Sequence, residues 1–212
     1  YYAPTLPEGE ADALVTLSDA QGNTRDLVYV GNGQYQQLVT AEAGRIYVME
    51  VDWNGTVYRA ESLLRPAVDI GDVELQFVEA NPRFDEGYTI RFTLQDPPEE
   101  DNYYRVYHSL NGVPQRDPDD LIISDDRLIN GGTGRITLFQ KLFSSGDTIF
   151  LEMAHIDQAA YDYFNSISDT ISAVGGPGVA TAAPANPETN WSNGALGYFM
   201  ALSVDSETVV IP

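Results

Sequence analysis

The sequence predicts a mainly β protein: an immunoglobulin-like β-sandwich at the N-terminus, followed by a second β-rich domain with one short helix. Apolar and polar residues alternate along many short segments, and clusters of Gly, Pro, Asn and Asp separate these segments. One stretch has the three-to-four-residue apolar spacing of a helix instead. The chain has 212 residues, of which 43% are hydrophobic, so it can bury a sizeable core and is not expected to be disordered.

The N-terminal third contains five expected strands. Asn54-Gly55 separates the last two and is the strongest short hairpin signal, because both residues tolerate a positive φ. Five strands at this spacing are typical of a small immunoglobulin-like sandwich, here expected to span residues 1–66. The expected strands are residues 11–18, 27–30, 34–39, 45–53 and 56–63. The side chains expected on the inward face are Tyr47, Met49, Val51, Trp53, Tyr58 and Ala60.

Residues 67–212 form the second expected domain. Its helix is expected at about residues 157–171, where Asp157 can cap the first turn and apolar side chains recur from Ala160 to Ile171. A Gly/Pro/Ala-rich loop follows at residues 175–187. The expected strands are residues 73–78, 88–94, 103–110, 121–124, 134–139, 148–155, 197–204 and 208–211.

Charge and composition exclude several classes of function. Asp and Glu number 32 against 11 Lys and Arg, giving a formal net charge of −21, and Lys141 is the only lysine. Binding to nucleic acid, or to an anionic membrane surface, is therefore not expected. The absence of cysteine excludes disulfides, thiolate metal sites and a cysteine nucleophile. No apolar run reaches the ~18 residues that a membrane-spanning helix needs.

Catalytic motifs are weak, and the chain is not expected to be an enzyme. The only histidines are His108 and His155, and no Gly-x-Ser-x-Gly elbow is present. A triad of His155 with Asp147 or Asp157 stays open, because a triad is recognised by geometry. The glycine-rich residues 131–134 precede a β-like segment rather than a helix and are interpreted as a hairpin turn.

Two acidic segments are candidates for binding Ca²⁺, the only cofactor that the sequence suggests. Calcium takes six to eight oxygen ligands, which Asp, Asn and backbone carbonyls in loops supply. Neither segment has the spacing of an EF-hand, and a solvated acidic loop is the alternative. One comprises Asp96, Glu99, Glu100, Asp101 and Asn102. The other, the metal site predicted here, comprises Asp117, Asp119, Asp120, Asp125 and Asp126.

Aromatic residues indicate where a partner could bind. Tyr and Trp are enriched at interfaces because they bury a large area at little entropic cost, although in β proteins they also fill cores. Trp191 lies in the loop of residues 186–194, between Asn190 and Asn193, and Tyr103-Tyr104 opens an expected strand. These five residues are the predicted binding residues.

Several landmarks along the chain carry a family resemblance. They are residues 15–19 with Gly22-Asn23, Gly33-Gln34-Tyr35, Gly44 with Tyr47, the Asn54-Gly55 hairpin, Pro66, Asp96-Pro97-Pro98, residues 102–104, residues 124–127, Gly146-Asp147-Thr148, residues 155–163, Asn186-Pro187, residues 194–199 and residues 209–212. Together they resemble a family of Bacteroidota outer-membrane lipoproteins known as a domain of unknown function and often encoded beside TonB-dependent transporters.

The resemblance implies a lipoprotein anchored in the outer membrane and exposed at the cell surface. It further implies that a signal peptide, a lipid-bearing cysteine and a first strand precede Tyr1, so that contact with the membrane is made through that anchor. The expected function is a non-enzymatic accessory or ligand-binding partner of a TonB-dependent transporter. The alternatives are an adhesin-like or structural surface module, stabilised by calcium, and a hydrolase. The acidity fits either a high-salt habitat or cation binding.

Overall fold

A computed structural model describes residues 9–80, 82, 85–98, 100–138, 141–174 and 186–212. The chain divides into two compact units. Unit 1 comprises Tyr1–Pro66 and Asp162–Leu202, and unit 2 comprises Ala67–Tyr161 and Ser203–Pro212. Each unit is therefore built from two separate stretches of sequence. The mainly β class with one α-helix, expected from the sequence, is confirmed for the described residues.

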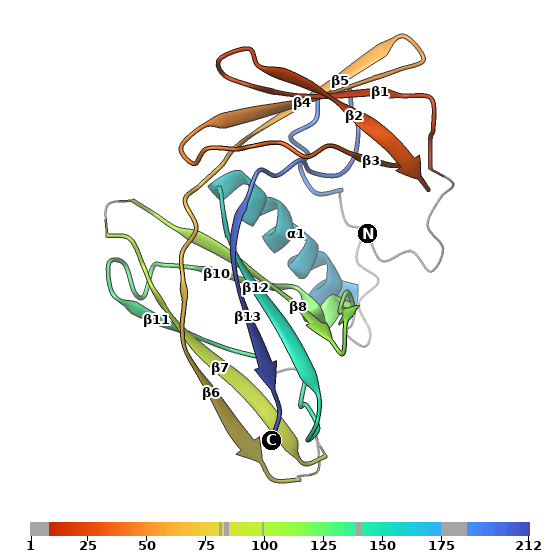
Figure 1. The fold of residues 1–212 in the computed structure, drawn as a ribbon. Coiled ribbons are helices and arrows are strands. Elements are labelled where there is room, and N and C mark those ends of the chain that lie inside the picture. The colour runs from red at the N-terminus through yellow and green to blue at the C-terminus, as the bar shows by residue number, and fades with distance from the viewer. Residues whose placement is uncertain (1–8, 81, 83–84, 99, 139–140, 175–185) are drawn as a thin grey trace. The chain divides into compact units, whose positions relative to one another are not determined.

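Unit 1 contains one five-stranded antiparallel sheet with the order β3-β2-β1-β4-β5 (Figure 1). Its strands are β1 (Leu14–Asp19), β2 (Thr24–Gly31), β3 (Gln34–Gln36), β4 (Ile46–Trp53) and β5 (Thr56–Leu63). The expected Asn54-Gly55 turn joins β4 to β5, with φ of 50° and 77° at its two residues. Because β1 pairs with both β2 and β4, these strands join edge to edge, whereas β3 pairs only with the second half of β2.

Register assigns the side chains of unit 1 to two faces. Val51 pairs with Val15 and Tyr58, and Met49 pairs with Ala60, so these side chains share a face. Alternating residues on this face are buried or half-buried, whereas their neighbours along β5 are exposed. The inward face predicted from the alternation is therefore confirmed.

Unit 2 contains the other two sheets. The strands of the first run in the order β10-β8-β12-β13, with β9 paired to β8, and those of the second run in the order β11-β7-β6 (Figure 1). The strands are β6 (Ile70–Val78), β7 (Gly87–Gln95), β8 (Tyr103–Leu110), β9 (Val113–Pro114), β10 (Ile122–Asp125), β11 (Thr133–Thr137), β12 (Thr148–Ile156) and β13 (Ser203–Val210). A short 3-10 helix, η1, spans Pro118–Asp120.

The core of unit 2 draws on both sheets. Phe92 and Leu94 alternate with half-buried residues along β7, while Ile149 and Leu151 alternate with the exposed Thr148 and Phe150 along β12. These side chains belong to one contiguous apolar cluster. Because side chains alternate between faces in a strand, each sheet presents one apolar face to this shared core.

The α-helix α1 (Gln158–Val174) begins where the sequence predicted and ends three residues later than the expected 171. The Asp157 carboxylate caps it by accepting a hydrogen bond from the Ala160 backbone N–H at 2.7 Å. Ala160, Phe164 and Ile167 are buried. No helix of the described residues is long and apolar enough to cross a membrane.

The end of the chain differs from the prediction. The two strands expected at residues 197–204 and 208–211 are replaced by the single strand β13, because residues 203–210 pair without interruption along β12. Residues 162–202 cluster with unit 1, whereas the prediction assigned them to a second domain of residues 67–212. Most of the expected Gly/Pro/Ala loop, residues 175–185, lies outside the described residues.

We expect Leu151→Ala to lower the free energy of unfolding by about 2–5 kcal/mol, because Leu151 is fully buried between the sheets of unit 2. Leu128 is 97% exposed, so Leu128→Ala, the same substitution at the surface, should change it by no more than about 0.5 kcal/mol. Chemical denaturation followed by circular dichroism measures both. Similar losses in the two variants would contradict this placement of the core.

Candidate functional site

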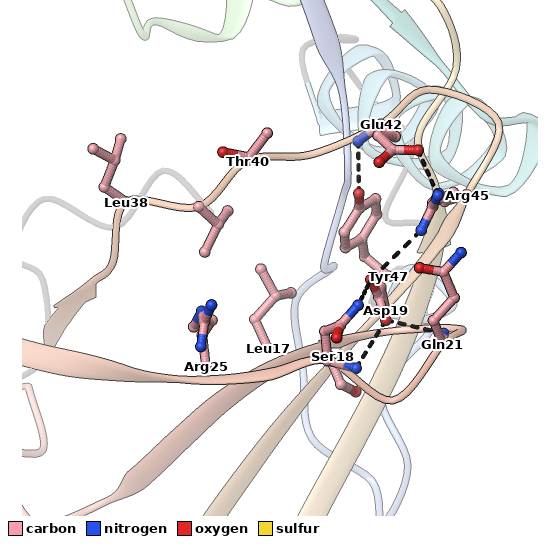
Figure 2. A pocket seen from close by; sticks show the side chains of 12 residues that line it. Leu17, Ser18, Asp19, Gln21, Arg25, Leu38, Thr40, Glu42, Arg45 and Tyr47 are labelled. Carbon is pink, nitrogen blue, oxygen red and sulfur yellow. Dashed lines mark hydrogen bonds and ion pairs between the residues drawn. The ribbon is translucent and has the colours of Figure 1, made fainter.

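A hollow of about 340 Å³ lies in unit 1 beside the start of β2 and the end of β1. Residues 38–42, which connect β3 to β4, run along one side of it, and the sheet lies opposite (Figure 2). The lining residues are Leu17, Ser18, Asp19, Gln21, Asn23, Arg25, Leu38, Val39, Thr40, Glu42, Arg45 and Tyr47. A hollow of this size is at the lower end of the range for small-molecule sites.

Strand register places the sheet residues of the hollow. On β1, Leu17 pairs with Arg25 of β2, and Asp19 pairs with Tyr47 of β4. Because Leu17 and Asp19 are two residues apart on the same strand, all four side chains share the inward face. Figure 2 shows Leu17 and Arg25 rising from the sheet toward the connection that carries Leu38. Leu38 itself is 95% exposed. This end of the hollow therefore combines a cationic group with apolar surface.

The other end is polar, and its charges are paired. Arg45 forms an ion pair with Glu42 at 2.5 Å and a longer one with Asp19 at 3.7 Å. The hydroxyl of Tyr47 accepts a hydrogen bond from the Glu42 backbone N–H at 2.8 Å. These contacts, drawn in Figure 2, hold the connection against the sheet.

Asp19 also organises the β1–β2 turn. Its carboxylate accepts hydrogen bonds from the side-chain amide of Asn23 at 2.8 Å and from the backbone N–H groups of Gln21 and Asn23. The side-chain bond from Asn23 contributes most to lowering the pKa of Asp19. The Asp19 carboxylate therefore already accepts three hydrogen bonds from its own turn. Among the described residues, Arg25 is then the one charged lining group that forms no ion pair.

Nothing in the sequence predicted this hollow. Its residues come from β1, β2, β4 and a connection, and no short motif links them. The expected strand at residues 27–30 does not reach Arg25, and it is the pairing of Arg25 with Leu17 in the structure that puts both on the same face. A charged residue at an inward position of a strand indicates either a partner or an opening in the packing.

The predicted binding residues of the 186–194 loop cover a sheet edge. The side-chain amides of Asn190 and Asn193 donate to the backbone carbonyls of Glu61 and Val57 at 2.9 and 2.7 Å. Ser192, between them, accepts a bond from the Arg59 N–H and donates one to the Arg59 carbonyl, each 2.8 Å long. These contacts satisfy the outer edge of β5. Asn190 and Asn193 therefore have a structural role that sequence reasoning missed.

The predicted aromatic contacts have different environments. The half-buried Trp191 lies 6.4 Å from Phe199, measured between ring centroids, and Tyr103 lies 5.0 Å from Tyr161. Tyr104 is fully buried and donates a hydrogen bond to Asp96, and burial raises the pKa of its hydroxyl. The prediction of Tyr104 as a contact residue is therefore wrong, because its ring belongs to the core of unit 2.

The five aspartates of the predicted metal site do not converge. Asp117 and Asp120 both form ion pairs with Lys141, the closer being 2.8 Å long for Asp120. Asp119 is exposed. Across the described residues, no group of three or more acidic or histidine side chains is arranged to hold a metal ion.

The other two aspartates of that set have separate partners. Asp125 pairs with Arg127 at 2.7 Å, and this bond contributes most to lowering the pKa of the Asp125 carboxyl. Asp126 is buried and accepts a hydrogen bond from the Asn102 backbone N–H at 2.8 Å. Asn102 belongs to the other acidic segment, and its side chain donates to the backbone carbonyls of Pro97 and Glu100. Glu99 of that segment lies outside the described residues.

Both histidines are interior. The His155 ring, in a residue that is 2% exposed, lies 5.4 Å from the ring of Tyr104. Asp147 and Asp157, its suggested triad partners, accept hydrogen bonds from Asn111 and Ala160, respectively.

The His108 side chain is 3% exposed, and its Nε2 lies 3.6 Å from the equally buried Asp120 carboxylate. Its ring nitrogens have no hydrogen-bond partner among the described residues. Burial is the main cause that lowers the pKa of His108.

Comparison with protein families shows a match to the domain of unknown function DUF4249 over residues 2–208. The chain belongs to the DUF4249 family. A comparison with curated proteins gives no match. Among solved structures, a two-domain fibronectin type-III segment of chicken tenascin matches with 12% identity and a TM-score of 0.27, over 71% of this chain and 79% of the other. A TM-score this low does not establish a shared fold between tenascin and this DUF4249 member.

We expect the free energy of unfolding to fall as the pH decreases below about 6.5, the ordinary pKa of histidine. The folded state holds the pKa of His108 below that value, so the unfolded chain binds a proton that the folded chain does not. One such proton contributes at most about 1.4 kcal/mol per pH unit. Urea denaturation between pH 7.5 and 5.5 should show the decrease in the free energy of unfolding, and this decrease should be smaller in His108→Phe. An unchanged pH dependence in His108→Phe would contradict this assignment.

We expect Asn190→Ala to lower the free energy of unfolding by about 1–3 kcal/mol. Its side chain makes three hydrogen bonds, two of them with the backbone of Phe199 and one with Glu61. Hydrogen exchange should also accelerate at the Arg59 amide, which bonds to the neighbouring Ser192. Asn165→Ala, at an exposed position of α1, is the control: it should leave exchange at Arg59 unchanged and should not lower the free energy of unfolding, because Ala favours the helix. Unchanged exchange at Arg59 in Asn190→Ala would show that the β5 edge does not depend on Asn190.

Proposed function

We propose that this chain is a non-enzymatic binding module that captures a small ligand for a TonB-dependent transporter, lipid-anchored at the outer membrane and exposed at the cell surface. The observation that carries the binding role is the hollow of unit 1, open to solvent beside the exposed Leu38 and lined by Arg25, which forms no ion pair within the described part of the chain. The location and the transporter are supported by the family resemblance of the sequence. Membership of DUF4249 is consistent with both.

The hollow has the construction of a recognition site. The sheet side of the hollow is formed by β1 and its two neighbours. The pairing of β1 with β2 is continuous from Ser18↔Thr24 to Val15↔Leu27. Its pairing with β4 is continuous from Leu14↔Asp52 to Asp19↔Tyr47. The opposite side is a connection tied to the sheet through Glu42. A loop positioned by a rigid sheet is a common arrangement for binding, because the sheet keeps the lining side chains in place before a ligand arrives.

The placement of other side chains favours the hollow over the other candidates. The loop around Trp191 has its polar groups engaged with β5. The predicted calcium ligands have separate partners, so no observation favours a calcium-stabilised adhesin. A hydrolase with a histidine triad would need one of its histidines to reach the substrate, and both His108 and His155 are buried.

We expect the intact lipoprotein, cross-linked in native outer membranes and isolated in mild detergent, to bring a TonB-dependent transporter with it. Mass spectrometry of the cross-linked partner identifies the transporter and the contact peptides. An abundant, unrelated outer-membrane lipoprotein isolated in the same way is the control for non-specific recovery. Repeated isolation of the protein without a transporter would overturn the proposal of an accessory partner.

A further inference from the structure

We propose that the hollow of unit 1 binds a small organic carboxylate, with the carboxylate on the Arg25 guanidinium and an aliphatic body against Leu17, Leu38 and Val39. The proposal rests on the ligand-capturing role and specifies its ligand. It follows from the charge of Arg25, the exposure of Leu38, and the place of all four residues in the lining of the hollow.

Arg25 is the lining group that favours an anionic ligand. At the polar end, Asp19 and Glu42 share one cation, Arg45, so that end keeps a net negative charge and offers no free cation. Arg25 forms no ion pair among the described residues, although the chain carries 32 acidic residues against 11 basic ones. An arginine offers a planar fork of N–H donors that matches the two oxygens of a carboxylate. A bound carboxylate would therefore supply the partner that Arg25 lacks among the described residues.

The same charges favour a single negative charge over a double one. Asp19 and Glu42 line the same hollow, and the whole chain has a formal net charge of −21. A phosphate dianion would meet about twice the repulsion of a monoanion while contacting the same single unpaired cation. At physiological salt the distant charges are largely screened, so the contact with Arg25 dominates for a monoanion. A carboxylate fits this balance better than a phosphate.

The apolar residues select the rest of the ligand. Leu38 is 95% exposed although it lines a hollow, and Figure 2 shows it on the same side as Leu17 and Arg25. An aliphatic chain next to Arg25 would remove these leucine side chains from water, which is favourable in proportion to the apolar area covered. A purely polar acid would leave that area exposed. The volume of about 340 Å³ limits the ligand to a small molecule or the end of a peptide.

The test uses the full 212-residue chain, ¹⁵N-labelled, and NMR titrations with sodium hexanoate. We expect hexanoate to shift the amide signals of Leu17, Arg25 and Leu38, with a dissociation constant on the order of millimolar. Hexan-1-ol and hexylammonium have the same chain without the negative charge and should bind at least about tenfold more weakly. Short peptides ending in leucine, with a free or an amidated C-terminus, show whether a peptide end or a free acid is preferred.

Matched variants test the two halves of the site. Arg25→Gln should weaken hexanoate binding at least about tenfold. Arg135→Gln, which changes another exposed arginine without an ion pair among the described residues, should leave it unchanged. Leu38→Ser should weaken binding several-fold, whereas Leu128→Ser, at a leucine that is 97% exposed outside the hollow, should not.

Several outcomes would overturn the proposal. They are an absence of shifts at Leu17, Arg25 and Leu38, equal binding of hexanoate and hexan-1-ol, and unchanged binding in Arg25→Gln. These measurements need no transporter, so their failure is distinguishable from a failure of the proposed function. If a transporter is recovered from membranes but hexanoate does not bind, the ligand class is wrong and the accessory role stands. If hexanoate binds and no transporter is recovered, the ligand class stands and the accessory role is wrong.

Discussion

The backbone hydrogen bonds at the edge of β5 determine which parts of the chain make up unit 1. An edge strand has a row of unpaired N–H and C=O groups that must be paired, covered or hydrated. Here the groups at Val57, Arg59 and Glu61 bond to residues 190–193, and the Arg59–Ser192 bond joins positions 133 residues apart. This pairing draws residues 162–202 into unit 1 and explains why its sequence is interrupted by most of unit 2.

The other end of the sheet is organised differently, and the difference produces the hollow. β3 has three residues and pairs with the last part of β2, from Val28 onward. After Gln36 the chain leaves β2 and runs along the hollow to reach β4, so the first half of β2, including Arg25, has no strand beside it on that side among the described residues. The ion pairs of Arg45 hold this connection in place. A short edge strand therefore leaves a charged, inward-facing side chain accessible.

The acidity of the chain is distributed rather than gathered. Carboxylates that are close in sequence have separate partners in the fold. Asp120 forms an ion pair with Lys141, while Asp126 accepts a hydrogen bond from the backbone N–H of Asn102. Each buried carboxylate that the structure describes thereby receives hydrogen bonds, which offset the cost of removing it from water. Two acidic segments in a sequence do not make a metal site, because the ligands must approach one point in space.

By itself the sequence determined most strands, the inward face of unit 1, the Asn54-Gly55 hairpin and the capped start of α1, because these depend on neighbours within a few positions. It did not determine the strand order of unit 1, the continuous β13, or the burial of Tyr104. For the site, the placement of Arg25 beside Leu17 and the crossing of residues 38–42 came from the fold, because the expected strand at residues 27–30 did not include Arg25. Tertiary structure alone decided these features, because they depend on which edges and faces meet across long stretches of chain, and local patterns carry no record of that pairing.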